Sequence, residues 1–151
     1  MGRELDILLK VSGYAGVRRF LDQTIAHVRE TGVTRTLFGR ERPIPDINSR
    51  NVNARGFAER TAVNSPLQGT AADLIKLAMV RIDAALEAGG HRSAMLLQVH
   101  DELVFEVPED EVDKTLPVIK HVMEDAPMPA LSLSVPLAVE ARAAHNWDEA
   151  H

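Results

Sequence analysis

The chain has 151 residues, of which 45% are hydrophobic, and a formal net charge of −5; this is long and apolar enough to bury the core of one domain. It contains no cysteine, which excludes disulfides and thiolate metal sites. Its longest apolar runs fall far below the roughly 20 residues of a membrane span, and no charged-then-apolar leader opens it. We therefore expect no membrane partner and a cytoplasmic location.

Charge is distributed unevenly along the chain. Residues 18–60 carry nine arginines and no lysine against five acidic residues, a net charge of +4, whereas residues 101–151 have a net charge of −9. Guanidinium forks suit phosphate binding, but composition alone favours a solvated helix face and a charged loop. Aromatic residues make up 4% of the chain, so recognition of single strands by stacking is disfavoured.

The first half of the chain predicts two helices around a short strand. Apolar residues recur at helical spacing over 16–31, and Gly32 stands where that helix should end. An apolar strand over 33–38 meets a turn at Gly39, and two prolines at 43 and 45 should keep the next segment extended. Residues 50–63 then predict a second helix.

A third helix is predicted to begin at Ser65 and to end at the glycines 89 and 90. Ser65 is the candidate N-cap, Pro66 occupies the first helical position, and Gln68 completes a capping box. An apolar stripe follows along this helix. We expect the stripe to pack against the sheet of the hairpin that comes next.

Two runs of strand-forming residues, 95–99 and 103–107, predict a β-hairpin with His100, Asp101 and Glu102 at its tip. A tight turn fixes its side chains in solvent, and Mg²⁺ prefers carboxylate oxygens held in this way. Acidic residues are also common in turns because they accept hydrogen bonds from the local backbone. The acidic pair by itself therefore favours an ordinary turn over a metal site.

The last third of the chain predicts a helix and a strand. Four acidic residues between 109 and 113 suit the start of a helix, and Pro117 should kink that helix or shorten its first turn. Residues 131–140 are apolar enough for a final strand, with Pro136 at an edge or a bulge. This order predicts an α+β fold in which an antiparallel sheet, including the hairpin, packs against helices.

Several blocks of sequence resemble the A family of DNA polymerases, the bacterial DNA polymerase I type. The hairpin string 98–108 resembles the third conserved motif of that family. Blocks at 36–40, 43–47, 58–60 and 64–76 follow the family's order and approximate spacing, and Asn146-Trp147 resembles its closing segment. The resemblance runs from about residue 14 to residue 151. It implies a palm-like fold and a DNA-directed DNA polymerase, a nucleotidyltransferase of DNA replication and repair.

The resemblance also suggests a division of the chain. Residues 1–13 are unassigned, residues 14–63 resemble the end of the fingers and their connection to the palm, and residues 64–151 resemble the palm. No interior linker rich in serine or glycine separates these parts, so we expect a single compact unit.

The hairpin tip supplies the candidate catalytic residues. Asp101 resembles the family's metal-binding aspartate, and Glu102 resembles the acidic neighbour that supports it. His100 resembles the family residue at the primer terminus and is a candidate DNA contact. Without the resemblance, His100 is as easily a turn histidine bonded to backbone.

Three further residues resemble family positions that contact the minor groove of template–primer DNA: Arg60, Asn64 and Gln68. Acceptors common to all base pairs line that groove, so contacts there check duplex shape without reading sequence. The alternatives are a helix-surface charge for Arg60, a turn residue before a cap for Asn64, and capping-box pairing with Ser65 for Gln68.

Two parts of the family's active site are not found in this sequence: the second metal-binding aspartate and the nucleotide-binding helix. The family implies two Mg²⁺ ions with template–primer DNA and dNTP as partners, but one acidic bend gives an incomplete site. We therefore expect the chain alone to be inactive. The alternative is a non-catalytic structural or weak duplex-DNA-binding remnant of the palm. The resemblance implies that the missing aspartate belongs to a strand beside the hairpin, so we also expect an open sheet edge here and a homo-oligomer built through it.

Overall fold

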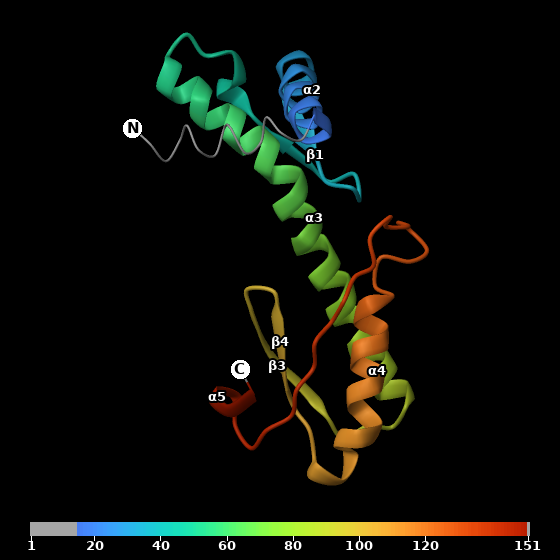
Figure 1. Cartoon of the computed structure of the whole chain (residues 1–151). Helices are drawn as coiled ribbons and strands as arrows, with labels where there is room; N and C mark the ends of the chain where they lie inside the picture. The colour runs from blue at the N-terminus through green and yellow to red at the C-terminus, as the bar shows by residue number, and fades with distance from the viewer. Residues whose placement is uncertain (1–14, 151) are drawn as a thin grey trace. The chain divides into compact units, whose positions relative to one another are not determined.

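The computed structural model describes residues 15–150, which belong to two compact units divided between Thr70 and Ala71. The expectation of a single compact unit is therefore corrected, and the unassigned segment 1–13 lies outside the described residues. Helix α3, Val52–Ala88, contributes to both units (Figure 1). The physical reason for the division is that two separate sets of apolar side chains are buried, one on each part of α3.

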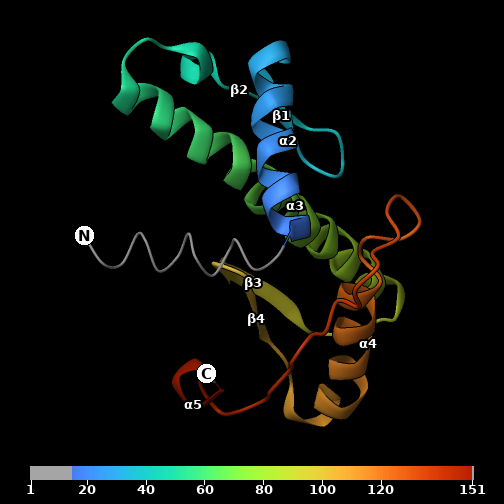
Figure 2. The same ribbon diagram turned by 45° about the horizontal axis from the view of Figure 1, so that its top comes forward.

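The first unit begins with helix α2, Ala15–Thr31, which confirms the helix predicted there. The chain turns at Gly32, whose φ of +75° suits glycine. Strands β1, Val33–Arg35, and β2, Glu41–Pro43, then pair antiparallel (Figure 2). The strand predicted over 33–38 is shorter than expected because residues 36–39 form a turn, in which the Gly39 amide donates to the Thr36 carbonyl at 2.9 Å.

A short 3₁₀ helix, η1, Pro45–Asn48, follows β2, so the extended segment predicted after the prolines is wrong. Proline fits the start of a helical turn, where no amide is needed as a donor. The turn buries Ile47, which joins the first core. That core consists of buried residues from α2, from the η1 region and from α3: Val28, Ile44, Ile47, Ala58 and Ala62.

Helix α3 is one continuous helix of 37 residues, where two helices were predicted. It starts after Asn51, whose Oδ1 accepts from the amides of Asn53 at 2.9 Å and Ala54 at 3.3 Å, as an N-cap does. Ser65 is not an N-cap, because its hydroxyl donates to the Thr61 carbonyl at 2.6 Å one turn back. The predicted capping box is therefore wrong, and Pro66 lies inside the helix.

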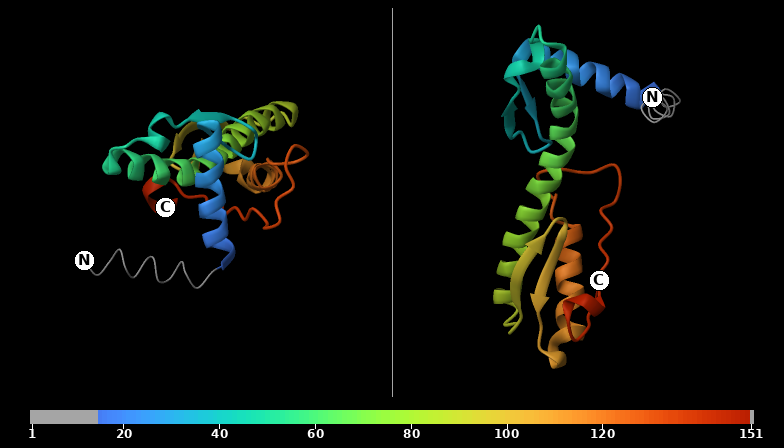
Figure 3. Two further views of the ribbon diagram at one scale, coloured as in Figure 1. Left: turned by 90° about the horizontal axis from the view of Figure 1, so that it is seen from above. Right: turned by 90° about the vertical axis from the view of Figure 1, so that its left-hand side faces the viewer.

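The second unit contains the predicted hairpin. Strands β3, Ala94–Val99, and β4, Glu102–Glu106, pair antiparallel with Val99 opposite Glu102 (Figure 3). A register shift lies between Met95 and Leu97. The inward side chains of the hairpin pack on the second core, which confirms the predicted packing against the C-terminal part of α3: Met95, Leu103 and Phe105 on Ala78, Ile82, Leu86 and Ala126.

The hairpin is followed by a 3₁₀ turn, η2, Glu109–Glu111, and by helix α4, Val112–Glu124. Pro117 lies inside α4, and the 3₁₀ turn stands in place of a first α-helical turn. In α4 Thr115 is fully buried, whereas Ile119 and Val122 pack on the second core.

The strand predicted over 131–140 is wrong, because this segment follows α4 without strand structure before helix α5, Trp147–Ala150. Within residues 15–150 each sheet has only two strands, so no third strand is present to pair with it. Pro136 also lacks an amide donor. One of the segment's amides, that of Val139, instead donates to the Glu124 carboxylate at 3.2 Å.

The α+β class with antiparallel sheets is confirmed. No helix among the described residues is long and apolar enough to cross a membrane.

Candidate functional site

The tip of the β3–β4 hairpin presents two carboxylates to solvent. His100 and Asp101 form the two-residue loop between Val99 and Glu102. His100 has a φ of 52°, in the left-handed region that tight turns require, and its carbonyl accepts from the Gln98 side-chain amide at 2.8 Å. His100, Asp101 and Glu102 are all exposed. The bend is thus held by paired strands while its acidic groups remain accessible.

The carboxylate oxygens of this bend are ligands of the kind that Mg²⁺ binds, but two carboxylates are too few to form a complete site. Hard divalent cations take oxygen ligands, and Mg²⁺ usually needs one or two carboxylates together with substrate phosphates. Asp101 and Glu102 offer such oxygens on a fixed turn. Within residues 15–150, however, no group of three histidine, cysteine, aspartate or glutamate side chains comes together to hold a metal ion. A cation at this bend therefore needs further ligands from a substrate or another segment.

The base of the hairpin is fixed by a separate charged cluster. Arg92, just before β3, donates through Nε to Glu111 Oε1 at 3.0 Å, and its guanidinium also pairs with Asp110. The Arg92 backbone amide donates to the same Glu111 carboxylate at 2.9 Å. These hydrogen bonds from Arg92 hold the pKa of Glu111 below its ordinary value. The contacts join the start of β3 to the turn before α4.

In the first unit, Arg60, Asn64 and Gln68 share one face of α3. They are spaced four residues apart along one helix, so they lie about 40° apart around its axis. All three side chains are exposed. Because Ser65 is inside the helix, the two readings that depended on a helix start there, a turn residue for Asn64 and a capping partner for Gln68, are removed. The surface-charge reading of Arg60 is compatible with its exposure.

The six candidate residues therefore form two groups. Arg60, Asn64 and Gln68 belong to the first unit, and His100, Asp101 and Glu102 belong to the second. Within each group the structure brings the side chains to one exposed surface.

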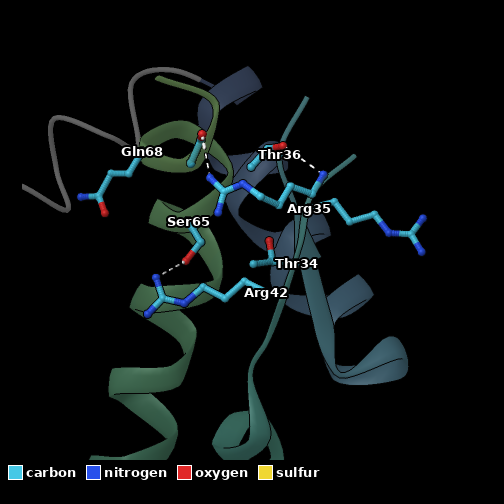
Figure 4. A pocket seen from close by; sticks show the side chains of 8 residues that line it. Thr34, Arg35, Thr36, Arg42, Ser65 and Gln68 are labelled. Carbon is cyan, nitrogen blue, oxygen red and sulfur yellow. Dashed lines mark hydrogen bonds between the residues drawn. The ribbon is translucent and has the colours of Figure 1, made fainter. Parts of the chain in front are cut away.

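A small pocket of about 60 Å³ lies where the β1–β2 hairpin meets α3 in the first unit (Figure 4). Arg42 Nη1 donates to the Ser65 hydroxyl at 3.2 Å, and Arg40 Nη2 donates to the Gly69 carbonyl at 3.2 Å. Gln68 lies at the pocket wall, and Arg35 extends away from these contacts and pairs with Glu41. This group was not predicted from the sequence. The available signal was Pro66 within a helical pattern, because a proline there leaves the carbonyl four residues earlier without its helical amide donor.

The arginine-rich segment is partly neutralised by its own acidic residues. Four ion pairs join Arg18 to Asp22, Arg29 and Arg55 to Glu59, and Arg35 to Glu41, with all seven side chains at least partly exposed. Such pairs are typical of a solvated charged surface. The positive excess of the segment therefore rests on its remaining arginines.

Comparison with known proteins agrees with these observations. Residues 11–149 match the family described as DNA polymerase family A. The chain is 49% identical over 137 residues to DNA polymerase I of Streptococcus pneumoniae serotype 4 and 51% identical over 140 residues to DNA polymerase I of Rhizobium leguminosarum. These alignments cover 91% of this chain but only 15% and 14% of those proteins.

A solved structure shows the same likeness in three dimensions. It is described as the POL domain of Pol1 from M. smegmatis in complex with DNA primer-template and dNTP. The match has a TM-score of 0.89 and 39% sequence identity, and covers 97% of this chain and 25% of that one. The α+β fold is therefore that of a polymerase domain. On the sequence match over residues 11–149 and this structural match, the chain belongs to DNA polymerase family A.

Proposed function

We propose that this chain is a C-terminal portion of a DNA-directed DNA polymerase, which joins nucleotides to a primer 3′ end under the direction of a template. The observation that carries the proposal is the exposed His-Asp-Glu bend on a two-stranded hairpin, in a chain that belongs to this family. The chain spans about 15% of the length of the curated relatives it matches. The complete reaction is therefore assigned to an assembly that includes the rest of such a protein.

In this proposal Asp101 is the catalytic metal ligand. Its carboxylate, with support from Glu102, would hold Mg²⁺ beside the reacting phosphate, and a second aspartate from outside these residues would complete the site. When bound, Mg²⁺ supplies electrostatic stabilisation of the charge that develops on the transferring phosphoryl group. The role of the hairpin is to hold Asp101 on a rigid turn, because a misplaced ligand loses most of that stabilisation. His100, on the same turn, contacts the primer terminus.

Arg60, Asn64 and Gln68 form the duplex-contacting surface of the proposal. Each carries a side-chain donor, and the minor groove presents N3 and O2 acceptors at every base pair. Donors on one helix face can therefore test whether a base pair has the correct shape without reading its identity. The exposure of all three side chains and their four-residue spacing on α3 support this role.

Reconstitution tests the proposal. The chain is mixed with a family A polymerase fragment that ends before these residues, and primer extension is measured with Mg²⁺. We expect extension from the mixture and from neither part alone. Asp101→Asn should reduce extension at least about 100-fold, since a preorganised electrostatic group of this kind contributes that much or more. Asp113→Asn, which removes another exposed carboxylate of the second unit, is the matched control and should retain activity.

A second candidate function is a non-catalytic remnant that binds duplex DNA weakly. The net charge of +4 over residues 18–60 favours it. If about three phosphate contacts form, the logarithm of the association constant should fall with the logarithm of salt concentration with a slope of about −3. Failure of every mixture to extend a primer, together with such a slope, would favour this candidate over the polymerase.

The partner and the compartment complete the proposal. The β3–β4 sheet has two strands within the described residues, and Leu96 and Leu97 on β3 are 54% and 44% exposed. A strand at the edge of a sheet presents backbone amides and carbonyls that can pair with a strand from a second copy of the chain. Light scattering after size exclusion should then show a dimer or larger species at micromolar concentration, and a clean monomer would refute this. The bacterial relatives support the cytoplasm of a bacterium as the location.

A further inference from the structure

Helix α3 has a defect in its ladder of backbone hydrogen bonds at Pro66. Proline has no amide hydrogen, so the carbonyl four residues earlier, that of Ala62, receives no helical hydrogen bond from it. Ala62 is 0% exposed, and water cannot readily satisfy that oxygen. A buried carbonyl without a partner destabilises the helix at this point.

The β1–β2 hairpin supplies the missing donor. The hydroxyl of Thr34, on β1, donates to the Ala62 carbonyl at 3.1 Å. Thr34 is itself 3% exposed, so the bond is shielded from water. The Ser65 hydroxyl next to Pro66 accepts from Arg42 on β2. The hairpin thus contacts α3 at two points in the helical turn that precedes the proline.

The β1–β2 hairpin also donates hydrogen bonds to the turn of α3 that follows Pro66. The Leu37 amide donates to the Thr70 hydroxyl at 2.9 Å, and Arg40 donates to the Gly69 carbonyl. These bonds join residues 34–42 to residues 62–70. We call the four hairpin-segment residues that donate them the brace: Thr34, Leu37, Arg40 and Arg42.

Two of the proposed duplex-contacting residues flank the defect. Asn64 lies two residues before Pro66, and Gln68 lies two residues after it. They share a face of α3 only while the helix continues through the proline. Opening of the helix at Pro66 would rotate Gln68 away from Asn64 and misalign their amide donors.

We propose that the brace is a positioning device for duplex recognition, and that Thr34 is its principal residue. The brace holds α3 helical through Pro66 and so keeps Gln68 in register with Asn64 and Arg60. Thr34 acts through the helix and does not itself contact DNA. This inference rests on the proposed function of the α3 face.

Amide hydrogen exchange on the full chain without DNA tests the brace itself. Thr34→Val keeps the shape of the side chain and removes its hydroxyl. We expect exchange of the amides at 63–70 to rise roughly tenfold, with Thr34→Ser near wild type. Thr115→Val, which alters another fully buried threonine, in the second unit, should leave these amides unchanged. Unchanged exchange at 63–70 in Thr34→Val would overturn the brace.

A further variant keeps the test decisive if Thr34→Val does not fold. Arg42→Met removes the bond to Ser65 from an exposed side chain and leaves the Thr34 contact in place. It should raise exchange in the same amides by a smaller factor. If neither variant that folds changes exchange there, the brace has no role in holding α3.

Duplex binding tests the positioning role. Binding at low salt is compared for a natural duplex and for one built with 3-deazapurines, which lack the N3 acceptor of the minor groove. We expect wild type to prefer the natural duplex about three- to tenfold. That preference should fall towards one in Thr34→Val and return in Thr34→Ser, with the salt slope unchanged, because phosphate contacts do not depend on the register of Gln68.

The outcomes separate the two proposals. A preference that persists in Thr34→Val would overturn the positioning role while the proposed function stands. If wild type does not distinguish the two duplexes, the minor-groove function fails, and the positioning role fails with it. The exchange measurement, made without DNA, still decides in that case whether the brace exists.

Discussion

Replacing Gly69 by alanine should loosen the contact between α3 and the β1–β2 hairpin. A Cβ atom built at Gly69 lies 2.6 Å from Thr36 Cγ2 and 3.4 Å from Arg40 Nη2. Carbon atoms do not approach to 2.6 Å, so Thr36 must move. It cannot move freely, because its hydroxyl accepts from the Arg40 amide at 3.2 Å and its β-branched side chain has few rotamers.

The magnitude follows from two opposing effects. Alanine in a helix is favoured over glycine by about 0.5–1 kcal/mol. Overpacking a well-filled contact costs typically about 1–3 kcal/mol. Gly69→Ala should therefore lower the free energy of unfolding, with a net loss of up to about 2 kcal/mol.

Gly56 provides a matched control on the same helix. A Cβ there lies 3.7 Å from Arg60 Nη1, an ordinary contact. Gly56→Ala should therefore raise the free energy of unfolding by about 0.5–1 kcal/mol. Urea denaturation followed by circular dichroism measures both variants against wild type. Equal stabilisation by the two alanines would refute the close approach of the hairpin to α3.

Two further predictions concern the second unit. Because Arg92 lowers the pKa of Glu111 in the folded state, this pair stabilises the fold above the ordinary glutamate pKa, and the contribution is lost as pH falls through the lower folded value. The Tm of Glu111→Gln should therefore decrease less than that of wild type between about pH 7 and about pH 3; parallel decreases would contradict this. Ile82 is 0% exposed in the second core, whereas Val80 is 69% exposed. Ile82→Ala should cost about 2–5 kcal/mol of unfolding free energy and Val80→Ala about 0.5 kcal/mol or less, and similar losses would show that the core is misassigned.

The elements that the sequence predicted well are those specified by local pattern. The hairpin at 94–106 has two runs of strand formers on either side of a short polar turn, and its pairing puts His100 and Asp101 in the loop as expected. Helix α2 ends at the glycine that its pattern indicates. In both cases the signals lie within a few residues of the structure that they specify.

The errors arose where distant residues decide the local structure. Ser65 and Pro66 have the spacing of a helix start, but the Thr34 hydroxyl, 28 residues earlier, satisfies the carbonyl that Pro66 leaves open. The helix therefore continues, and Gln68 is on its exposed face instead of in a capping box. Residues 131–140 have a strand-like composition, but a strand forms only when another strand pairs with it. Neither outcome can be read from the segment itself.

In the candidate site, too, the features set by nearby residues were predicted and those set by distant residues were not. The positions of Asp101 and Glu102 depended on one local turn and were predictable once the hairpin was identified. The contacts of Arg40 and Arg42 with α3 could not be predicted from composition, which favoured a solvated charged loop. They depend on how the β1–β2 hairpin packs on α3, a helix that begins nine residues after β2 ends.

In the proposed function, Asp101 and a second carboxylate from outside this chain bind the catalytic metal, and locating the metal tests this most directly. Crystals of the chain assembled with its complementary polymerase fragment, primer–template and a non-hydrolysable dNTP are soaked in Mn²⁺, and anomalous scattering marks the ion. We predict a peak at about 2.0–2.3 Å from an Asp101 carboxylate oxygen, with a carboxylate of the complementary fragment as a second ligand. An occupied metal site that leaves Asp101 uncoordinated would contradict the account.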